Sequence, residues 1–204
     1  MTEPKNSIIC PVCGKTAKRL PIHVNPLYRC DECGFLSSDE NVVNISYGDP
    51  RSASLSNLYP HEFILYGLYP TTNLSEKQIT CPSMESFLQG LKIQDKDLQN
   101  IFMRNYSGMA AYKMSAILND WKDSQTLWFN GVPYNRYSDE YTELITKAYD
   151  ALFETNVIFR EIVLPKFKGK ILIHTTGKDD RSDTVLTEEE FRYQLNRLMK
   201  RLKA

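Results

Sequence analysis

Four of the five cysteines stand in two Cys-x-x-Cys pairs, Cys10 with Cys13 and Cys30 with Cys33, and sixteen residues separate the pairs. Two such pairs at this distance are typical of a zinc site. A glycine follows the second cysteine of each pair, so each pair can form a turn whose backbone amides point at the thiolate sulfurs. The spacing therefore predicts a structural Zn²⁺ site with these four cysteines as the metal ligands.

The segment around this site predicts a small zinc ribbon over residues 1–40. Residues 17–24 and 27–29 have the composition of short strands, and Pro26 separates them. A segment this short cannot bury a core of its own, so the metal has to hold it together; the alternative is a metal-free pair of loops. His23 is expected on the ribbon surface because four thiolates already complete the site.

Charge and hydropathy limit what the chain can bind. Lysine and arginine together number 25, as do aspartate and glutamate, so the net charge is zero. This balance argues against a protein that coats nucleic acid by bulk electrostatics. The ribbon is locally basic, which predicts docking of a nucleic acid or another macromolecule, and a solvated face explains the same charges. No apolar run is long enough to cross a bilayer and no leader segment is evident, so we expect a cytoplasmic protein without membrane contact.

A polar ridge on one predicted helix is the first candidate for chemistry in the rest of the chain. Glu85, Gln89 and Lys92 follow one another at spacings of four and three, so a helix over residues 82–93 places them on one side. The helix macrodipole is expected to lower the pKa of Glu85, near the start, and Lys92 at the other end suits an anion. The alternative is a solvated polar stripe.

Two loops offer further polar groups. Residues 51–60 are rich in hydroxyls and amides that can wrap a sugar or a phosphate, and residues 174–183 concentrate acids at the exit of a strand. Solvated loops are the alternative for both. Trp121 is either a core residue or a stacking face for a nucleobase. Cys81 is expected to be a small buried or capping residue, with a reactive thiol as the alternative.

Periodicity predicts an α+β domain over residues 41–204, mostly helical with a few short strands. The expected strands cover residues 42–46, 62–66, 126–130 and 170–174. The expected helices cover residues 82–93, 95–106, 108–120, 138–155 and 156–164, the last ended by Pro165. Thr187-x-x-Glu190 is a capping box that opens a C-terminal helix. The polar residues 37–41 predict the boundary with the ribbon.

Two motifs of this domain resemble the NADAR family, also called YbiA-like. They are Leu55-Ser56-Asn57-Leu58-Tyr59-Pro60 and the segment from Ser83-Met84-Glu85 through Gln89 to Lys92-Ile93. Gly108 to Lys113 and Trp121 are similar to later parts of the family pattern, and the resemblance covers residues 50–200. The sequence departs from the pattern at Ser86, where the family has histidine, and at residues 174–177, where an acid and then Asp with Trp-Gly are usual.

The resemblance implies a NADAR-like fold and an N-glycosidase. Family members cleave a nucleobase-like amine from ribose phosphate in riboflavin intermediates or remove ADP-ribose from guanine. Such cleavage passes through an oxocarbenium-like state, which needs a carboxylate and a proton donor for the departing nitrogen. The resemblance implies that Glu85 is the carboxylate and that Asp179 or Asp180 is the second acid. The residues it implies for binding phosphate, ribose and base are Arg51, Ser56, Asn57, Tyr59, Gln89, Lys92, Lys113, Trp121 and His174.

The function that we expect is hydrolysis of the N-glycosidic bond of an ADP-ribosylated or phosphoribosylated base, with the ribbon favouring guanine in nucleic acid. A riboflavin-pathway phosphoribosylamino-pyrimidine is the alternative substrate. Two alternatives lie outside enzymes: a module that binds ADP-ribose, a nucleotide or a protein without turnover, and a zinc-ribbon regulator that binds nucleic acid.

Overall fold

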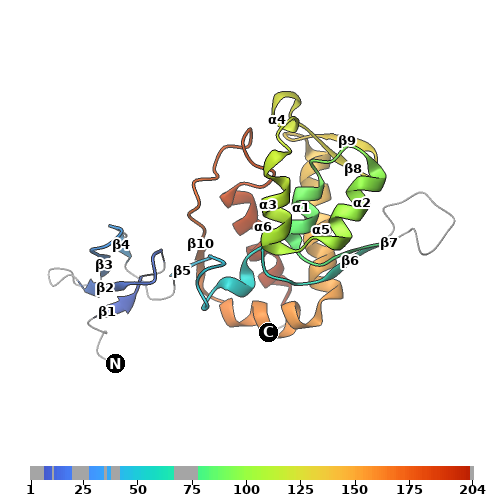
Figure 1. The fold of residues 1–204 in the computed structure, drawn as a ribbon. Coiled ribbons are helices and arrows are strands. Elements are labelled where there is room, and N and C mark those ends of the chain that lie inside the picture. Colours follow the sequence, from blue (N-terminus) through green and yellow to red (C-terminus); the bar gives the residue numbers. More distant parts are fainter. Residues whose placement is uncertain are drawn as a thin grey trace.

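The structure is a computed structural model that describes residues 7–10, 12–19, 28–34, 36–37, 42–66 and 78–202 (Figure 1). Its buried apolar side chains form two separate clusters. The smaller cluster contains Cys10, Ala17, Tyr28 and Cys30. The larger one extends from Ile45 to Met199 and forms the core of a mixed α/β domain. The predicted fold class, α+β with a zinc-ribbon-like cysteine cluster in front, is confirmed.

The N-terminal part is a four-stranded antiparallel sheet in chain order. Its strands are β1 (Ser7–Ile9), β2 (Thr16–Arg19), β3 (Tyr28–Cys30) and β4 (Leu36–Ser37). Both predicted strands are present where the structure describes them. His23, Pro26 and residues 38–41 of the predicted 37–41 boundary lie outside the described residues, while Ser37 ends β4.

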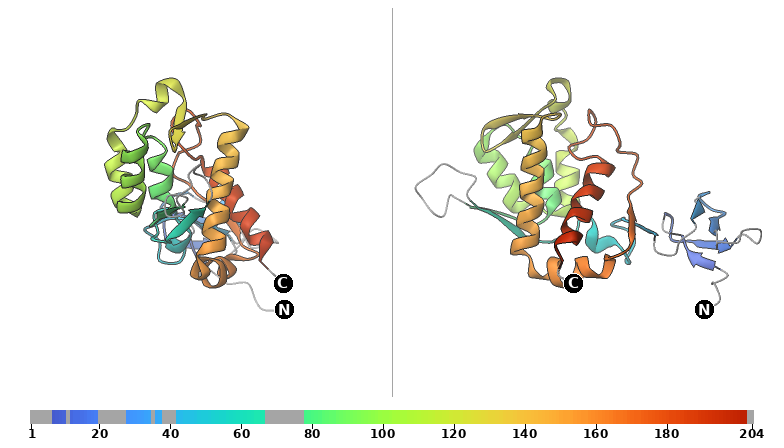
Figure 2. Two further views of the ribbon diagram at one scale, coloured as in Figure 1. Left: turned by 90° about the vertical axis from the view of Figure 1, so that its right-hand side faces the viewer. Right: turned by 180° about the vertical axis from the view of Figure 1, so that it is seen from behind.

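Three two-stranded sheets brace the larger domain. Their strands are β5 (Val42–Asn44) with β10 (Ile171–Ile173), β6 (Phe63–Tyr66) with β7 (Gln78–Cys81), and β8 (Thr126–Phe129) with β9 (Val132–Asn135). Among these three pairs only β5 with β10 is parallel, and it lies next to the ribbon, where the start of the domain pairs with the strand that precedes α6 in the chain (Figures 1 and 2). The four predicted strands are confirmed to within two residues. The sequence missed β7, and it missed β9 because Pro133 interrupts the strand pattern.

Among the described residues of the domain, helices cover far more of the chain than strands do, in line with the prediction. They are α1 (Met84–Gly90), α2 (Lys96–Asn105), α3 (Gly108–Met114), α4 (Trp121–Ser124), α5 (Asp139–Thr155) and α6 (Glu188–Arg201). Short 3-10 turns cover Ala53–Leu55 and Ser115–Ile117. The expected helix end at Pro165 is wrong: a π-helical turn, Phe159–Val163, passes directly into a 3-10 turn, Leu164–Phe167, because proline is tolerated in a first turn.

Helix caps set the two helix starts that matter for the site. The Ser83 hydroxyl accepts a hydrogen bond from the Ser86 amide and closes a capping box, so α1 begins after Ser83 and not at Pro82. The Thr187 side chain does the same with Glu190 at the start of α6, as the sequence predicts. Each cap places a glutamate, Glu85 or Glu188, in the first turn.

Helix α1 lies inside the domain, with α2, α3 and α5 packed around it (Figures 1 and 2). All seven of its residues are buried, Glu85 and Gln89 included. Gly108 allows α3 to approach closely, because a Cβ atom at this position would lie 2.2 Å from the Leu58 carbonyl oxygen. The solvated-stripe interpretation is therefore wrong for Glu85 and Gln89.

Candidate functional site

A cavity of about 620 Å³ lies where α1, α3, the start of α6 and the loop after β10 meet. Its volume is in the usual range for small-molecule sites. Five residues singled out from the sequence line it: Ser56, Asn57, Glu85, Gln89 and His174. These residues come from three distant parts of the chain, and the fold brings them to one cavity.

Glu85 is the buried acid of this cavity, with 8% of its surface exposed. Burial raises the pKa of its carboxyl group to about 7, against the opposing effects of a hydrogen bond from Gln89 and the charge of Lys92. The expected lowering by the helix macrodipole is wrong, since burial in a short, wholly buried helix outweighs it. The protonated form of this carboxyl group is therefore accessible near neutral pH.

A chain of hydrogen bonds fixes the orientation of this acid. The Gln89 amide nitrogen donates to Glu85 Oε1 at 2.8 Å, and the Ser115 hydroxyl donates to Gln89 Oε1 at 2.7 Å. The Glu85 backbone amide donates to the Asn57 carbonyl at 2.9 Å, and the Tyr149 hydroxyl donates to Asn57 Oδ1 at 2.7 Å. The Ser56–Asn57 loop and α1 are thus held as one unit.

Glu188 is a second carboxylate in the same cavity, and the sequence did not single it out. Its Oε1 accepts hydrogen bonds from the Thr176 amide, from the Thr176 hydroxyl at 2.9 Å and from the amides of Gly177 and Lys178 at 2.7 and 3.3 Å. These donors hold the pKa of Glu188 below its usual value although burial alone would raise it. The predicted capping box was the signal that placed this residue in a helix first turn.

His174 and Lys178 complete the polar wall. His174 Nδ1 lies 2.7 Å from the Ile45 carbonyl, which can only accept, so Nδ1 carries the hydrogen in this contact. Its ring also meets the edge of Phe191 at a centroid distance of 5.0 Å. Lys178 is the cation among the residues that line the cavity, and sequence reasoning did not select it.

The predicted second acids do not lie in this cavity. Asp179 and Asp180 are exposed, and Asp179 lines a different cavity beside Arg181 and Glu190. Asp180 turns back to accept a hydrogen bond from the Ser182 amide, which lowers its pKa. The carboxylate supplied by this part of the chain is Glu188 instead, because the loop wraps around the start of α6.

The predicted phosphate-binding cations also lie outside the cavity lining. Arg51 forms an ion pair with Asp49 at 2.6 Å, and Lys113 is exposed on α3. Lys92 follows the end of α1 and is partly buried. Burial, together with the charges of Lys122 and Lys178, lowers its pKa to about 8 against the pull of Glu85. Lys92 and Lys178 therefore lie close enough to repel each other.

The predicted stacking residue is part of the core. Trp121 is 4% exposed and belongs to the large buried cluster, so it presents no face to the cavity. Tyr59 stacks tilted on His61 at 4.7 Å, also outside the cavity lining. Two tyrosines that the sequence did not single out, Tyr47 and Tyr112, line the cavity and are exposed. They supply the aromatic surface that was assigned to Trp121.

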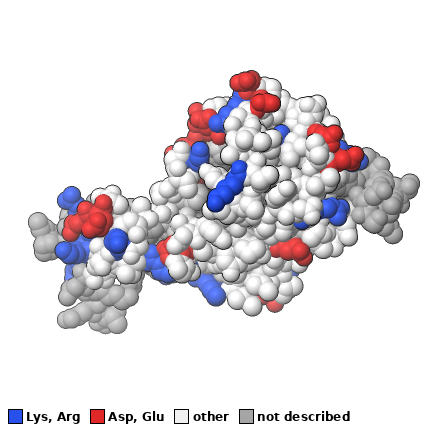
Figure 3. Space-filling view, in the orientation of Figure 1, with Lys and Arg blue, Asp and Glu red and all other residues white. Residues whose placement is uncertain are grey.

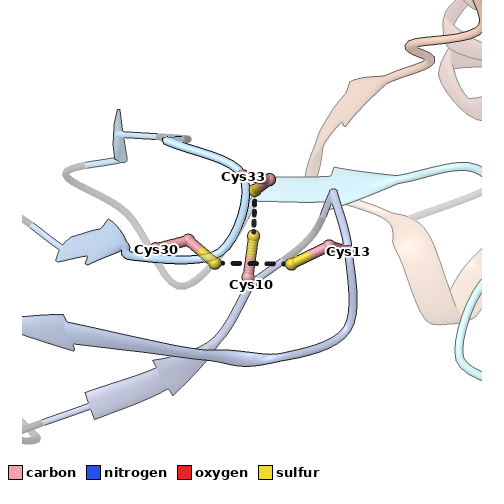
Figure 4. A group of neighbouring side chains, drawn as sticks. All are labelled: Cys10, Cys13, Cys30 and Cys33. Carbon is pink, nitrogen blue, oxygen red and sulfur yellow. Dashed lines mark hydrogen bonds between the residues drawn. The ribbon is translucent and has the colours of Figure 1, made fainter.

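The four paired cysteines form the other candidate site. Their side chains point toward one another (Figure 4), and all four sulfurs lie within 4.8 Å of one another. Four sulfurs bound to one Zn²⁺ are about 3.8 Å apart, so small adjustments would fit a tetrahedral ion. Amides of Val12 and Cys13 donate to the Cys10 sulfur, as the two glycine turns predict. The cluster can hold a metal ion.

Cys81 is a core residue, as expected. It is fully buried on β7, and burial raises the pKa of its thiol far above the usual value. An inert thiol follows, since the thiolate is the reactive form.

The surface carries both signs of charge, in keeping with the zero net charge. Figure 3 shows basic and acidic side chains spread over the visible face, with several basic ones on the ribbon. Among the described residues, no helix is long and apolar enough to cross a membrane.

Comparison with known proteins places the larger domain in a family. The sequence pattern of the family described as bacteriophage protein GP30.3 matches residues 50–200. The chain belongs to this family. A relative, an uncharacterized 17.1 kDa protein from the Gp30-rIII intergenic region of Enterobacteria phage T4, is 34% identical over 148 residues, which cover 72% of this chain and 89% of that protein. No solved structure matches.

The GP30.3 family match covers most, but not all, of the residues that line the cavity. It includes Ser56, Asn57, Glu85, Gln89, His174 and Glu188. It leaves out the cysteine ribbon and β5, although residues 44–48 and Val12 line the cavity as well. This member of the GP30.3 family therefore builds one side of its cavity from residues outside the family pattern.

Proposed function

We propose that this chain is an N-glycosidase of the NADAR type that hydrolyses the bond between ribose and base in an ADP-ribosylated or phosphoribosylated base. One observation carries the proposal: Glu85, which the resemblance to NADAR proteins implies as a reacting residue, lies in a cavity that is also lined by Glu188, whose pKa is held low. Two carboxyl groups whose surroundings move their pKa values apart suit a pair of acid and base.

The proposed reaction uses the two glutamates in different states. Protonated Glu85 gives its proton to the departing base nitrogen as the C1′–N bond breaks and its electron pair moves to nitrogen. The Glu188 carboxylate stabilises the oxocarbenium-like cation and takes a proton from the attacking water, whose oxygen forms the new C1′–O bond. The products are the free base and ADP-ribose or ribose phosphate, and the transferred proton returns from Glu188 to Glu85 through solvent.

The remaining polar groups of the cavity match the rest of such a substrate. Ser56, Asn57 and His174 offer hydrogen-bonding groups for ribose hydroxyls. Lys178, with Lys92 nearby, supplies positive charge for phosphate. Tyr47 and Tyr112 supply faces on which a base can stack.

For the ribbon we propose a structural Zn²⁺ held by Cys10, Cys13, Cys30 and Cys33. Four thiolates leave no open coordination position, so the ion shapes the fold and takes no part in the reaction. The ribbon favours a macromolecular substrate, ADP-ribosylated guanine in nucleic acid, because it reaches the cavity through Val12 and carries basic side chains such as Lys15 and Lys18. A free riboflavin-pathway intermediate is the alternative substrate.

The test is base release by the purified full-length protein. We expect ADP-ribose to appear from an oligonucleotide that carries ADP-ribosylated guanine, and the rate to collapse in Glu85→Gln. Glu143→Gln, an exposed glutamate on α5, is the matched control and should keep the wild-type rate. If base is released only from the riboflavin-pathway phosphoribosylamino-pyrimidine, that compound is the substrate. Tight binding of ADP-ribose without turnover of either substrate would show a binding module and overturn the enzyme.

A further inference from the structure

Asn44, the last residue of β5, connects the cysteine ribbon with the cavity. It is 5% exposed and lines the cavity. Its side-chain nitrogen donates to the Val12 carbonyl at 3.4 Å and to the Thr175 hydroxyl at 3.2 Å. A carbonyl can only accept, so the contact with Val12 fixes the nitrogen on the ribbon side and the oxygen on the other.

The side-chain oxygen of Asn44 has no hydrogen-bond partner within the described part of the chain, although it is buried. A buried polar atom without a partner costs free energy, on the order of 1 to 3 kcal/mol, and native proteins rarely retain one without a reason. Since the residue lines the cavity, a ligand that brings an N–H or O–H group to this oxygen removes the cost.

The other end of this contact lies in the metal-binding turn itself. The Val12 amide donates to the Cys10 sulfur, and the Val12 carbonyl accepts from Asn44. Arg51 makes a parallel contact, from Nη2 to the Cys10 carbonyl at 3.4 Å. A metal ion that draws the four sulfurs together would therefore act on this turn, and with it on the Val12 part of the cavity wall.

We propose that the ribbon is a wall of the ligand cavity and that Asn44 is a ligand-binding residue, so that metal in the ribbon strengthens ligand binding. Asn44 Oδ1 accepts a hydrogen bond from a hydroxyl or amine of the ligand, while its nitrogen holds the metal-bound turn against the cavity. The identity of the ligand, an ADP-ribosyl group, rests on the proposed function; the wall itself does not.

Ligand binding gives the first test. The dissociation constant of ADP-ribose is measured by calorimetry for the zinc-loaded wild type, Asn44→Leu and the exposed control Asn196→Leu, each with and without chelation of the metal. We expect Asn44→Leu to bind about tenfold more weakly and Asn196→Leu to match the wild type. Chelation should weaken the wild type several-fold and Asn44→Leu less. Wild-type affinity in Asn44→Leu, or no effect of chelation on the wild type, would overturn the proposal.

Hydrogen exchange without ligand separates this proposal from the function. On chelation, we expect faster deuterium uptake in wild-type peptides from residues 42–48 and 174–178, while α5 stays protected. In Asn44→Leu these peptides should exchange faster even with metal bound. If uptake changes only within residues 7–37, the wall is wrong even where ADP-ribose binds. If ADP-ribose fails to bind but deuterium uptake changes as expected, the ribbon remains a wall of the cavity and ADP-ribose is ruled out as the ligand.

Discussion

Glu85 and Glu188 lie in the first turns of two capped helices, and the surroundings shift their pKa values in opposite directions. Each lies in the first turn of a helix, after a Ser83 or Thr187 cap that closes a capping box. Each is 8% exposed and lines the same cavity. The pKa of Glu85 is nevertheless raised to about 7, while that of Glu188 is lowered.

The difference comes from how deeply each carboxyl group is buried and from the hydrogen-bond donors around it. Glu85 accepts one hydrogen bond, from the Gln89 side chain, which does not offset its burial. Glu188 accepts from three backbone amides and a hydroxyl of the Thr176–Lys178 turn, which outweigh burial. Position in a helix first turn therefore does not decide the charge state of a glutamate; the depth to which its carboxyl group is buried and the donors around it do.

The largest expected effect comes from replacing Glu85, the glutamate with the raised pKa. Glu85→Gln keeps the oxygen that Gln89 contacts but removes the transferable proton, so we expect base release to slow by a factor of about 10² to 10⁴. The measurement is single-turnover release of the base at pH 7. A rate within twofold of the wild type would remove Glu85 from the reaction.

The next largest effect is expected from replacing Glu188, the glutamate with the lowered pKa. Glu188→Gln loses the charge that strengthens four hydrogen bonds, so we expect the free energy of unfolding to fall by about 2 to 3 kcal/mol at pH 7. In the wild type this stabilisation is present above the pKa that Glu188 has in the unfolded chain, and it is lost as pH falls through the lower pKa of the folded protein. The difference in unfolding free energy between wild type and Glu188→Gln should therefore shrink below pH 4. Urea unfolding measures it. The exposed neighbour Glu189→Gln is the control, and an equal loss there would contradict the account.

The same comparison predicts that replacing Glu85 has the opposite effect on stability. Its raised pKa contributes stability that is fully present below about pH 4.5 and is lost as pH rises through about 7. Glu85→Gln should therefore stabilise the protein above pH 8, on the order of 1 to 2 kcal/mol, and have little effect at pH 4. Thermal unfolding at the two pH values tests this. Destabilisation at pH 8 would show that the carboxylate is well solvated or paired.

The smallest expected effect concerns the acids that were predicted from the sequence. Asp179→Asn and Asp180→Asn should change the rate of base release by less than about twofold, because both side chains lie outside the cavity. A loss comparable to that of Glu85→Gln would return one of them to the reaction and remove Glu188 from it.

Local patterns in the sequence were sufficient for several features. The cysteine spacing, the Thr187–Glu190 capping box and the helix expected over residues 138–155 depend on residues close in the sequence, and the structure agrees with each. Glu85 and Gln89 were recognised from their spacing on one helix, and both lie in the cavity.

Other features depend on contacts between distant segments. Glu188 owes its environment to a loop ten to twelve residues earlier, and Asn44 to both the ribbon and Thr175. Burial of the whole of α1 reversed the expected pKa shift of Glu85, and a helical pattern alone does not reveal that neighbours cover every face. The same lack of long-range information put Trp121 at the site and left Tyr112 out.

The most direct test of the account is a titration of the glutamate side-chain carboxyl carbons by NMR in the wild type, with Glu85→Gln and Glu188→Gln to assign the two signals. The account predicts one signal with a pKa of about 7 that disappears in Glu85→Gln, and a second below 4.5 that disappears in Glu188→Gln. Two signals that titrate together near 4.5 would contradict the assignment of acid and base, and with it the proposed reaction.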